Sequence, residues 1–243
     1  MLEIGKNAVN EALEAGANIE KLCVQKDLRS DALSRIVKKA RERGVKIIFT
    51  DKAWLDKNAG GAAHQGVIAV SSEYKYYDLE EIVSAARAAG KQMTILLLDG
   101  VEDPHNLGAI IRVADCAGVD AVVVPKHRGC GVTDAVSKTS AGAVQYVKVA
   151  KVTNINDTVR YLREEGFTVY ATDMDGKSMY SADLTGDIAI IIGGEGNGVH
   201  ALTKKLADGI IAIPQFGRVN SLNASVAAGV VVYEAVRQRE KHD

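Results

Sequence analysis

Short apolar runs alternate with amphipathic segments along nearly the whole 243-residue chain, and this alternation restricts the fold more than any other feature. TILLLD (94–99) and IAIII (188–192) are runs typical of strands, and the first is apolar enough to be covered on both faces. DALSRIVKKARERG (31–44) has its apolar residues at helical spacing and ends at a glycine. Strands that alternate with such helices predict an α/β fold with a mostly parallel sheet flanked by helices.

The alternation is interrupted by the polar and tyrosine-rich segment SSEYKYYD (71–78), which we interpret as an exposed linker. It predicts a small α/β domain over 1–71, a linker and first helix over 72–90, and a larger domain over 91–243. Helices are expected over 7–17, 31–44, around Trp54, and over 79–90, 107–118, 154–166 and 221–239. Strands are expected over 20–25, 45–50, 66–70, 94–99, 120–125, 168–173, 188–192 and 210–214.

Charge and cysteine content argue against several classes of protein. The formal net charge of −1 gives no overall attraction to nucleic acid, so such a partner would need a local basic patch. The three cysteines and five histidines are widely spaced, which argues against disulfides and a metal site. Charged residues near the N-terminus argue against a signal peptide, and no apolar run approaches the roughly 18 residues of a membrane span. We therefore expect a cytoplasmic protein with neither metal nor membrane partner.

Three expected strands are followed by unusual polar loops: DGVEDPHNLGAIIR (99–112), GGEGNGV (193–199) and IPQFGRVNSLNASVAAG (213–229). In open α/β sheets ligands bind beyond the carboxyl ends of strands, so the three loops can form one pocket. The glycines of the second loop permit positive φ and close backbone approach to a ligand. They match neither the G-x-G-x-x-G dinucleotide pattern nor a phosphate loop, which disfavours a nucleotide-dependent oxidoreductase.

Each loop also has a purely structural interpretation. Asp103 and Pro104 favour the start of a helix. Arg112 has Asp115 three residues on as an ion-pair partner, and Ser221 is a suitable N-cap for the last helix. Taken singly, the loops therefore leave the structural and the functional interpretation open.

Together the three loops closely resemble the three motifs of the SpoU/TrmH family of RNA ribose 2′-O-methyltransferases, within the SPOUT superfamily. GKNAVNEAL (5–13), HQGV (64–67) and SKTSAGA (137–143) extend the resemblance to the RlmB branch, which methylates a guanosine of 23S ribosomal RNA. The matching motif residues are Asn106 and Arg112 in the first loop, Gly193, Glu195 and Gly198 in the second, and Pro214, Ser221, Leu222 and Asn223 in the third.

This resemblance implies a trefoil-knotted catalytic domain, one of the rare exceptions to the rule against knots. It implies S-adenosylmethionine as the cofactor, held by main-chain groups near Gly193, Gly194, Ile213 and Leu222. The methyl group is already activated in this cofactor, so no metal is required. A 23S rRNA or a ribosome precursor is the implied substrate. The alternatives are a transfer RNA, another ribosomal nucleotide, or a non-catalytic RNA-binding protein.

The resemblance also implies catalytic roles. Arg112 is the family's essential arginine, and gripping phosphate while stabilising the alkoxide suits a permanently protonated guanidinium better than accepting a proton does. Asn106, Ser221 and Asn223 are implied to orient Arg112, ribose and cofactor. Glu195 is implied to anchor one of these groups, with a solvated loop carboxylate as the alternative.

Two further cations are candidates for phosphate contact. Arg218 follows the third strand end, and Lys138 lies in SKTSAGA, although a solvated surface lysine is the simpler interpretation of Lys138.

The first domain resembles the small RNA-binding domain of this branch, which is similar to ribosomal proteins L30e and L7Ae. Basic residues near one helix form either a solvated face or a phosphate-binding patch. These basic residues are Arg29, Arg35, Lys38, Lys39, Arg41 and Arg43.

The last helix is apolar around much of its circumference, which is more than one buried face requires, so a homodimer of catalytic domains is expected.

Overall fold

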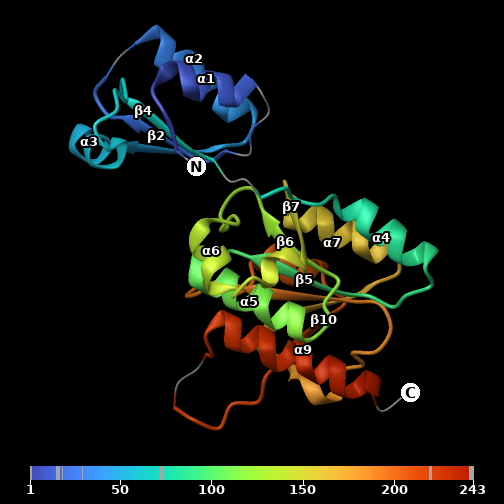
Figure 1. Ribbon diagram of the computed structural model, residues 1–243. Helices are drawn as coiled ribbons and strands as arrows, with labels where there is room; N and C mark the ends of the chain where they lie inside the picture. Colours follow the sequence, from blue (N-terminus) through green and yellow to red (C-terminus); the bar gives the residue numbers. More distant parts are fainter. Residues whose placement is uncertain are drawn as a thin grey trace. The chain divides into compact units, whose positions relative to one another are not determined.

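A computed structural model of the chain describes residues 2–14, 17, 19–28, 30–71, 74–218 and 221–240 (Figure 1). The chain forms two compact units, Met1–Lys75 and Tyr76–Asp243.

The first unit is a four-stranded mixed sheet with helices on both faces. The strand order is β1 (Leu2–Ile4), β4 (Val67–Ser71), β2 (Ile19–Gln25) and β3 (Lys46–Thr50), with only β2 and β3 parallel. Helices α1 (Lys6–Glu14) and α2 (Asp31–Glu42) pack on one face, and α3 (Lys52–Ala59) packs on the other. The three residues of β1 are too few to give a periodic signal, so this strand was not expected.

The second unit is built on a six-stranded sheet in which every pair of neighbours is parallel. The predicted α/β class and mostly parallel sheet are confirmed. The strand order is β10 (Gly209–Ala212), β8 (Thr168–Ser178), β9 (Ile188–Gly193), β5 (Thr94–Asp99), β6 (Ala121–Pro125) and β7 (Lys148–Val152).

Helices cover both faces of this sheet (Figure 1). On one face α4 (Leu79–Ala88) and α7 (Ile155–Glu164) pack against Ile95, Leu97 and their neighbours. The alternate residues Leu96 and Leu98 are equally buried and face the layer of α5 (Pro104–Cys116) and α9 (Ala224–Glu240). Burial on both faces explains why β5 is a continuous apolar run.

Several short elements were not predicted from the sequence. Helices of six residues and an edge strand with two lysines carry too little periodicity to be recognised. They are α6 (Asp134–Thr139), α8 (Ala201–Leu206) and β7, with single-turn helices η1 (Ala143–Gln145) and η2 (Met179–Ser181).

The end of the expected linker belongs to the second unit. The Val132 amide donates to the Tyr76 hydroxyl at 2.8 Å, and the Tyr77 amide donates to the Val149 carbonyl at 3.0 Å. Asp78 caps α4 by accepting from two backbone amides of its first turn. Ser72 and Glu73 lie outside the described residues. The second unit therefore begins before α4.

Helix α5 begins at Pro104, as Asp103 and Pro104 indicated, although its apolar pattern starts three residues later. The Asp103 side chain accepts from the His105 amide, and proline suits the first helical position. Helix α9 begins at Ala224, and Asn223, not Ser221, accepts from the Ser225 amide at 2.9 Å. The expected N-cap role of Ser221 is wrong.

Within the described ranges, no helix is long and apolar enough to cross a membrane.

Candidate active site

The three polar loops meet through three side chains. Asn106 Nδ2 donates to Glu195 Oε1 at 2.7 Å, and Asn223 Nδ2 donates to Asn106 Oδ1 at 2.8 Å. Asn223 Nδ2 also lies 3.1 Å from Glu195 Oε1. One residue comes from each loop, so this asparagine–glutamate cluster joins segments that are up to 117 residues apart in the chain.

The Asn223 amide has only one consistent orientation. Its Oδ1 accepts from the backbone amide and the hydroxyl of Ser225, at 2.9 and 2.6 Å. An amide oxygen accepts and an amide nitrogen donates, so Nδ2 must face the other loops. The cap of α9 thereby aims Asn223 at Asn106 and Glu195.

The glycine loop approaches its neighbours too closely for side chains. A Cβ at Gly194 would overlap the Gly100 carbonyl, and one at Gly193 would overlap the backbone of Gly198 and Val199. The Gly194 amide donates to the Asp99 carbonyl at 2.9 Å. These positions therefore require glycine for close packing of backbone on backbone.

Two cavities lie on either side of this loop. The first, the β8 cavity, has a volume of about 580 Å³, within the usual range for small-molecule sites. It is lined by Thr172, Asp173, Met174, Asp175, Ile192–Gly198, Lys204, Ile211, Ile213, Gln215, Ser221–Ala224 and Ala227.

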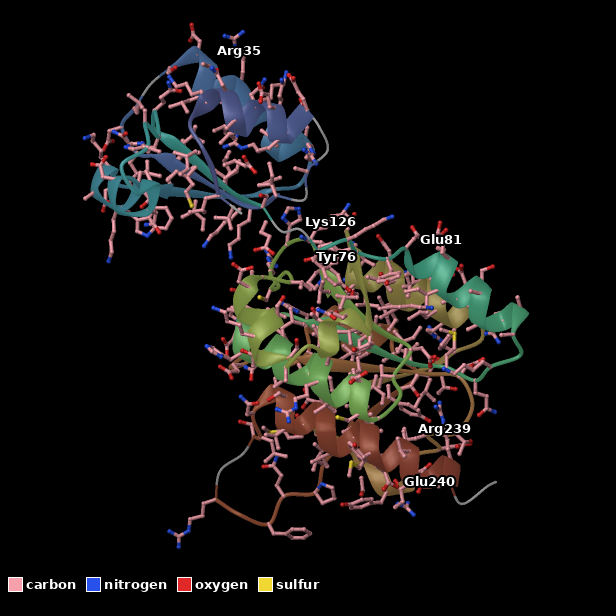
Figure 2. The ribbon with its side chains drawn as sticks, in the orientation of Figure 1. Arg35, Tyr76, Glu81, Lys126, Arg239 and Glu240 are labelled. Atoms are coloured by element: carbon pink, nitrogen blue, oxygen red, sulfur yellow. The ribbon has the colours of Figure 1, made fainter. Side chains whose placement is uncertain are left out.

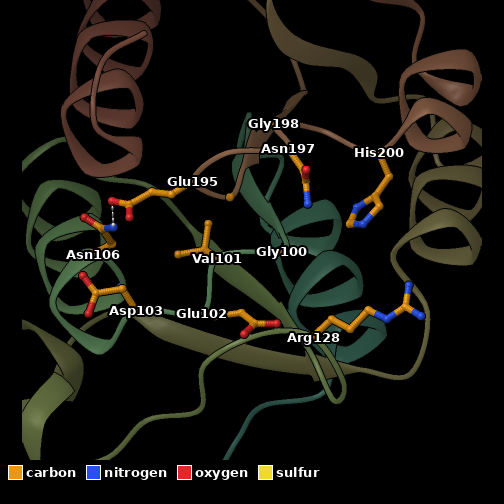
Figure 3. A pocket seen from close by; sticks show the side chains of 11 residues that line it. Gly100, Val101, Glu102, Asp103, Asn106, Arg128, Glu195, Asn197, Gly198 and His200 are labelled. Atoms are coloured by element: carbon orange, nitrogen blue, oxygen red, sulfur yellow. Dashed lines mark hydrogen bonds between the residues drawn. The ribbon is translucent and has the colours of Figure 1, made fainter.

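The second, the β5 cavity, has a volume of about 690 Å³ (Figure 3). The two cavities share Gly194, Glu195, Asn197 and Gly198, so the glycine loop is their common wall. The remaining residues of the β5 cavity are Gly100, Val101, Glu102, Asp103, Asn106, Arg128 and His200.

Asp173 and Lys204 form an ion pair in the wall of the β8 cavity. Lys204 Nζ lies 2.7 Å from Asp173 Oδ2, and this hydrogen bond holds the pKa of the Asp173 carboxyl below its usual range, while burial opposes the shift. The carboxylate therefore stays ionised at neutral pH, and because Lys204 lines the same cavity, the ion pair adds no net charge to it.

The predicted cofactor residues Gly193, Gly194, Ile213 and Leu222 all line the β8 cavity, and so does Ser221. Asn106 lines the β5 cavity instead.

Arg112 does not join them. It is exposed on α5, lines neither cavity, and forms no ion pair with Asp115 or with any other described residue. The space beside Gly108 is filled by α6, since a Cβ there would lie 2.6 Å from Thr139 Cβ. In a single chain, Arg112 is therefore apart from the asparagine–glutamate cluster.

Arg218 and Lys138 are exposed and also line neither cavity.

Some of the basic residues around α2 are already paired. Lys39 lies 2.7 Å from Glu14, and Lys38 lies 3.9 Å from Glu42. The Arg43 guanidinium donates to backbone carbonyls at and beyond the end of α1. Lys39 and Arg43 therefore link α2 to α1, whereas the contact of Lys38 is long and exposed.

The other members of the basic group have more freedom. Arg35 projects from α2 into solvent (Figure 2), and neither Arg35 nor Arg41 has an ion-pair partner in the described part of the chain. Arg29 lies outside the described residues. A phosphate-binding patch would therefore be smaller than the sequence suggests.

Several polar residues of the cavities were missed, among them Asp173, Lys204, His200 and Arg128. Asp173 ends an expected strand, so the strand-end rule identifies it as a candidate. Lys204 and His200 belong to the start of a helix too short to be recognised. Arg128 has a left-handed φ of 56°, for which the sequence gives no signal.

No group of three or more His, Cys, Asp or Glu side chains in the described residues is placed to hold a metal ion.

The family model described as the SpoU rRNA methylase family matches residues 93–233, and the model for RNA 2′-O ribose methyltransferase substrate binding matches residues 4–77. The chain belongs to the SpoU rRNA methylase family. The predicted SpoU/TrmH family and the predicted RNA methyltransferase class are thus confirmed.

Relatives and solved structures agree with this family. A Staphylococcus haemolyticus protein assigned to the TrmH family of tRNA/rRNA methyltransferases is 40% identical over 240 residues, covering 98% of this chain and 96% of the relative. The SpoU methyltransferase AviRb from Streptomyces viridochromogenes, solved with AdoMet, is 26% identical with a TM-score of 0.62, covering 99% and 91% of the two chains. A solved RNA 2′-O ribose methyltransferase is 25% identical with a TM-score of 0.56, covering 99% and 89%.

In this SpoU-family chain, Glu195→Ala would remove the acceptor of the buried Asn106 amide. We expect the free energy of unfolding to fall by about 1–3 kcal/mol, the cost of a buried polar group left without a partner. Glu195→Gln keeps an acceptor oxygen and should lose clearly less. Urea unfolding measures both, with Glu102→Ala, a carboxylate of the same cavity outside the cluster, as the control. Equal losses for Glu195→Ala and Glu102→Ala would contradict the role of the cluster.

Proposed function

We propose that this chain transfers the methyl group of S-adenosylmethionine to a ribose 2′-hydroxyl of RNA. The observation that carries the proposal is the asparagine–glutamate cluster at the wall shared by two cavities, in a chain of the SpoU family. In this proposal the β8 cavity holds the cofactor, the β5 cavity holds the RNA, and the reacting atoms meet at the edge of the loop that both cavities share.

A guanosine of 23S rRNA is the substrate we favour, because the sequence resembles the RlmB branch outside the three motifs. A transfer RNA is the alternative, since the names of the relatives include both kinds of RNA. Mapping 2′-O-methylation by mass spectrometry in RNA from a strain that lacks the gene distinguishes the two.

The β8 cavity suits S-adenosylmethionine. Its glycine wall presents backbone without side chains, and Ile213 and Leu222 supply apolar surface for an adenine ring. Gly193, Gly194, Ile213 and Leu222 would hold the adenosyl part, and solved AdoMet complexes exist for related chains.

When bound, S-adenosylmethionine supplies an already activated methyl group. The residues of the chain then have to align the ribose and manage the hydroxyl proton. Asn106 and Asn223 both donate to Glu195, and these hydrogen bonds hold the two cavities in fixed positions relative to one another. The Ser221 hydroxyl lines the β8 cavity and is available to the reacting groups.

The first unit is proposed to bind the phosphate backbone of RNA. Arg35 and Arg41, which form no ion pair in the described residues, are the proposed contacts. We also retain the division into 1–71, 72–90 and 91–243, and a trefoil knot in the last of these segments.

A homodimer of second units is proposed from the surface of α9. Val226 and Tyr233 are about half exposed, and with Val230 they form a stripe at helical spacing opposite the buried face. Arg112 lies on α5, which packs against α9, so a second copy gives this arginine a route to the partner's active site.

Light scattering at micromolar concentration is expected to give a particle of two chains. Tyr233→Arg places a charge in the stripe and should yield single chains that keep the wild-type circular dichroism spectrum. Tyr146→Arg, which changes another exposed tyrosine of the same unit, is the control and should remain dimeric. A wild-type monomer would remove the dimer from the proposal.

Isothermal calorimetry should detect binding of S-adenosylmethionine and of its demethylated product, and no binding of NAD. Radiolabelled methyl groups should then appear in RNA from the deletion strain. Binding of NAD without S-adenosylmethionine, or no transfer to any RNA fraction, would contradict the proposed activity.

Arg112→Lys should leave fold and cofactor affinity nearly intact while methyl transfer falls about 10²–10³-fold, the loss of roughly 3–4 kcal/mol of transition-state stabilisation. The reason is that lysine keeps the charge but lacks the planar fork of donors. Single-turnover methylation and a thermal melt with cofactor measure the two effects. Near-wild-type turnover would end the catalytic assignment of Arg112.

A further inference from the structure

The β5 cavity has two chemically different ends (Figure 3). Asn106 and Glu195 lie at one end, where the asparagine–glutamate cluster joins the loops. Arg128 and His200 lie at the other end, and Gly100 and Val101 lie between the two. The proposed function uses the first end and leaves the second without a role.

His200 is held in one orientation by Asp99. Asp99 is buried, and its two carboxylate oxygens accept from the His200 backbone amide at 3.0 Å and from Nδ1 at 2.8 Å. An ionised carboxylate only accepts, so Nδ1 carries the proton. In the neutral ring Nε2 is then an acceptor, and it has no partner among the described residues.

Arg128 is held over the same cavity by its loop. Its backbone is left-handed, and Gly129 follows where a Cβ would lie 2.7 Å from Pro125 Cγ. The Cys130 amide donates to the Val101 carbonyl at 3.0 Å, which ties this loop to the edge of the cavity. A non-glycine residue in this conformation costs about 1–3 kcal/mol and persists where the surroundings fix it.

The Arg128 guanidinium has no ion-pair partner in the ranges the structure describes. Three carboxylates also line the cavity, but Asp103 caps α5 and Glu195 belongs to the cluster. Glu102 forms no ion pair with Arg128. Arg128, whose backbone is held by its loop, and the oriented ring of His200 therefore line the same cavity without an ion pair to Arg128 or a partner for Nε2 among the described residues.

We infer that this end of the β5 cavity binds a ribose–phosphate unit of RNA next to the methylated nucleotide. Arg128 donates to the phosphate, and His200 Nε2 accepts a hydrogen bond from a 2′-hydroxyl. The chemistry is complementary, because phosphate accepts and the 2′-hydroxyl donates. His200 thus distinguishes RNA from DNA. The inference rests on the proposed function, since the shared wall places this RNA beside the cofactor cavity.

The test of Arg128 uses methyl transfer by the full chain to total RNA from a strain that lacks the gene. Arg128→Ala should raise KM about tenfold, the value of a charged hydrogen bond, with kcat and calorimetric affinity for S-adenosylhomocysteine unchanged. The slope of log KM against log salt should become shallower by about 0.7–0.9, the contribution of one phosphate contact. Arg128→Lys should restore the slope.

The matched control is Arg160→Ala, an exposed arginine of α7 that pairs with Asp157 and lines neither cavity. It should leave KM and the salt slope as in the wild type. An Arg128→Ala variant that behaves like this control, or that loses kcat and cofactor affinity instead of RNA affinity, overturns the role of Arg128.

The test of His200 compares inhibition of the same reaction by a single-stranded RNA 20-mer and by DNA of the same sequence. The wild type should prefer RNA, and His200→Ala should reduce the ratio about fivefold, whereas Arg128→Ala weakens both inhibitors equally. Asp99→Asn keeps the ring but reverses its hydrogen bond, so Nε2 becomes a donor and the preference should also fall.

A wild-type ratio near one, or a ratio that His200→Ala leaves unchanged, overturns the role of His200. These outcomes are separate from failure of the proposed function. A wild type that binds no S-adenosylmethionine and methylates no RNA removes that function. An active wild type with indifferent Arg128 and His200 variants removes only the inference.

Discussion

The amide of Asn223 is the interaction on which the geometry of the active site depends. Its oxygen caps α9, and its nitrogen reaches Asn106 and Glu195. A helix start and the junction of three loops therefore share one side chain. Because the cap determines which end of the amide is the donor, the folding of α9 and the assembly of the site are coupled through hydrogen bonds that cannot be exchanged.

The glycine loop packs closely against the neighbouring backbone at this junction. Gly194 packs its backbone against Gly100, and the loop separates two cavities with little more than main chain. A side chain at either of the first two glycines would force the walls apart, at a typical cost of 1–3 kcal/mol for an overpacked interior.

Three arginines of the second unit have the same side chain but different surroundings. Arg112 is exposed on a helix and can act only on something brought to it, such as RNA or a second copy. Arg128 is held by a left-handed turn at the edge of a cavity. Arg160 is paired with an aspartate on its own helix. All three carry the same guanidinium group, so their different functions follow from their surroundings.

Periodicity and strand-end loops were sufficient to predict the α/β class, the parallel sheet and the three loops, because apolar patterning records which faces are buried. The SpoU/TrmH resemblance likewise depends on residues that can be read in order. The six-residue helices α6 and α8 were missed because so few residues carry no helical periodicity, and β7 was missed because its two lysines interrupt the apolar run. The N-cap of α9 was assigned to Ser221 instead of Asn223, since both are good caps and only packing selects between them.

The sequence by itself determined the family, the layers of the fold and the candidates Asn106, Glu195 and Asn223. Only the tertiary structure decided that these three bond to one another while Arg112 stands apart. It also brought Asp99 to His200, 101 residues away, and turned Arg128 toward the same cavity. The physical reason is that local pattern encodes burial, whereas hydrogen-bond partners depend on where distant strand ends meet, and that is set by the packing of the whole sheet.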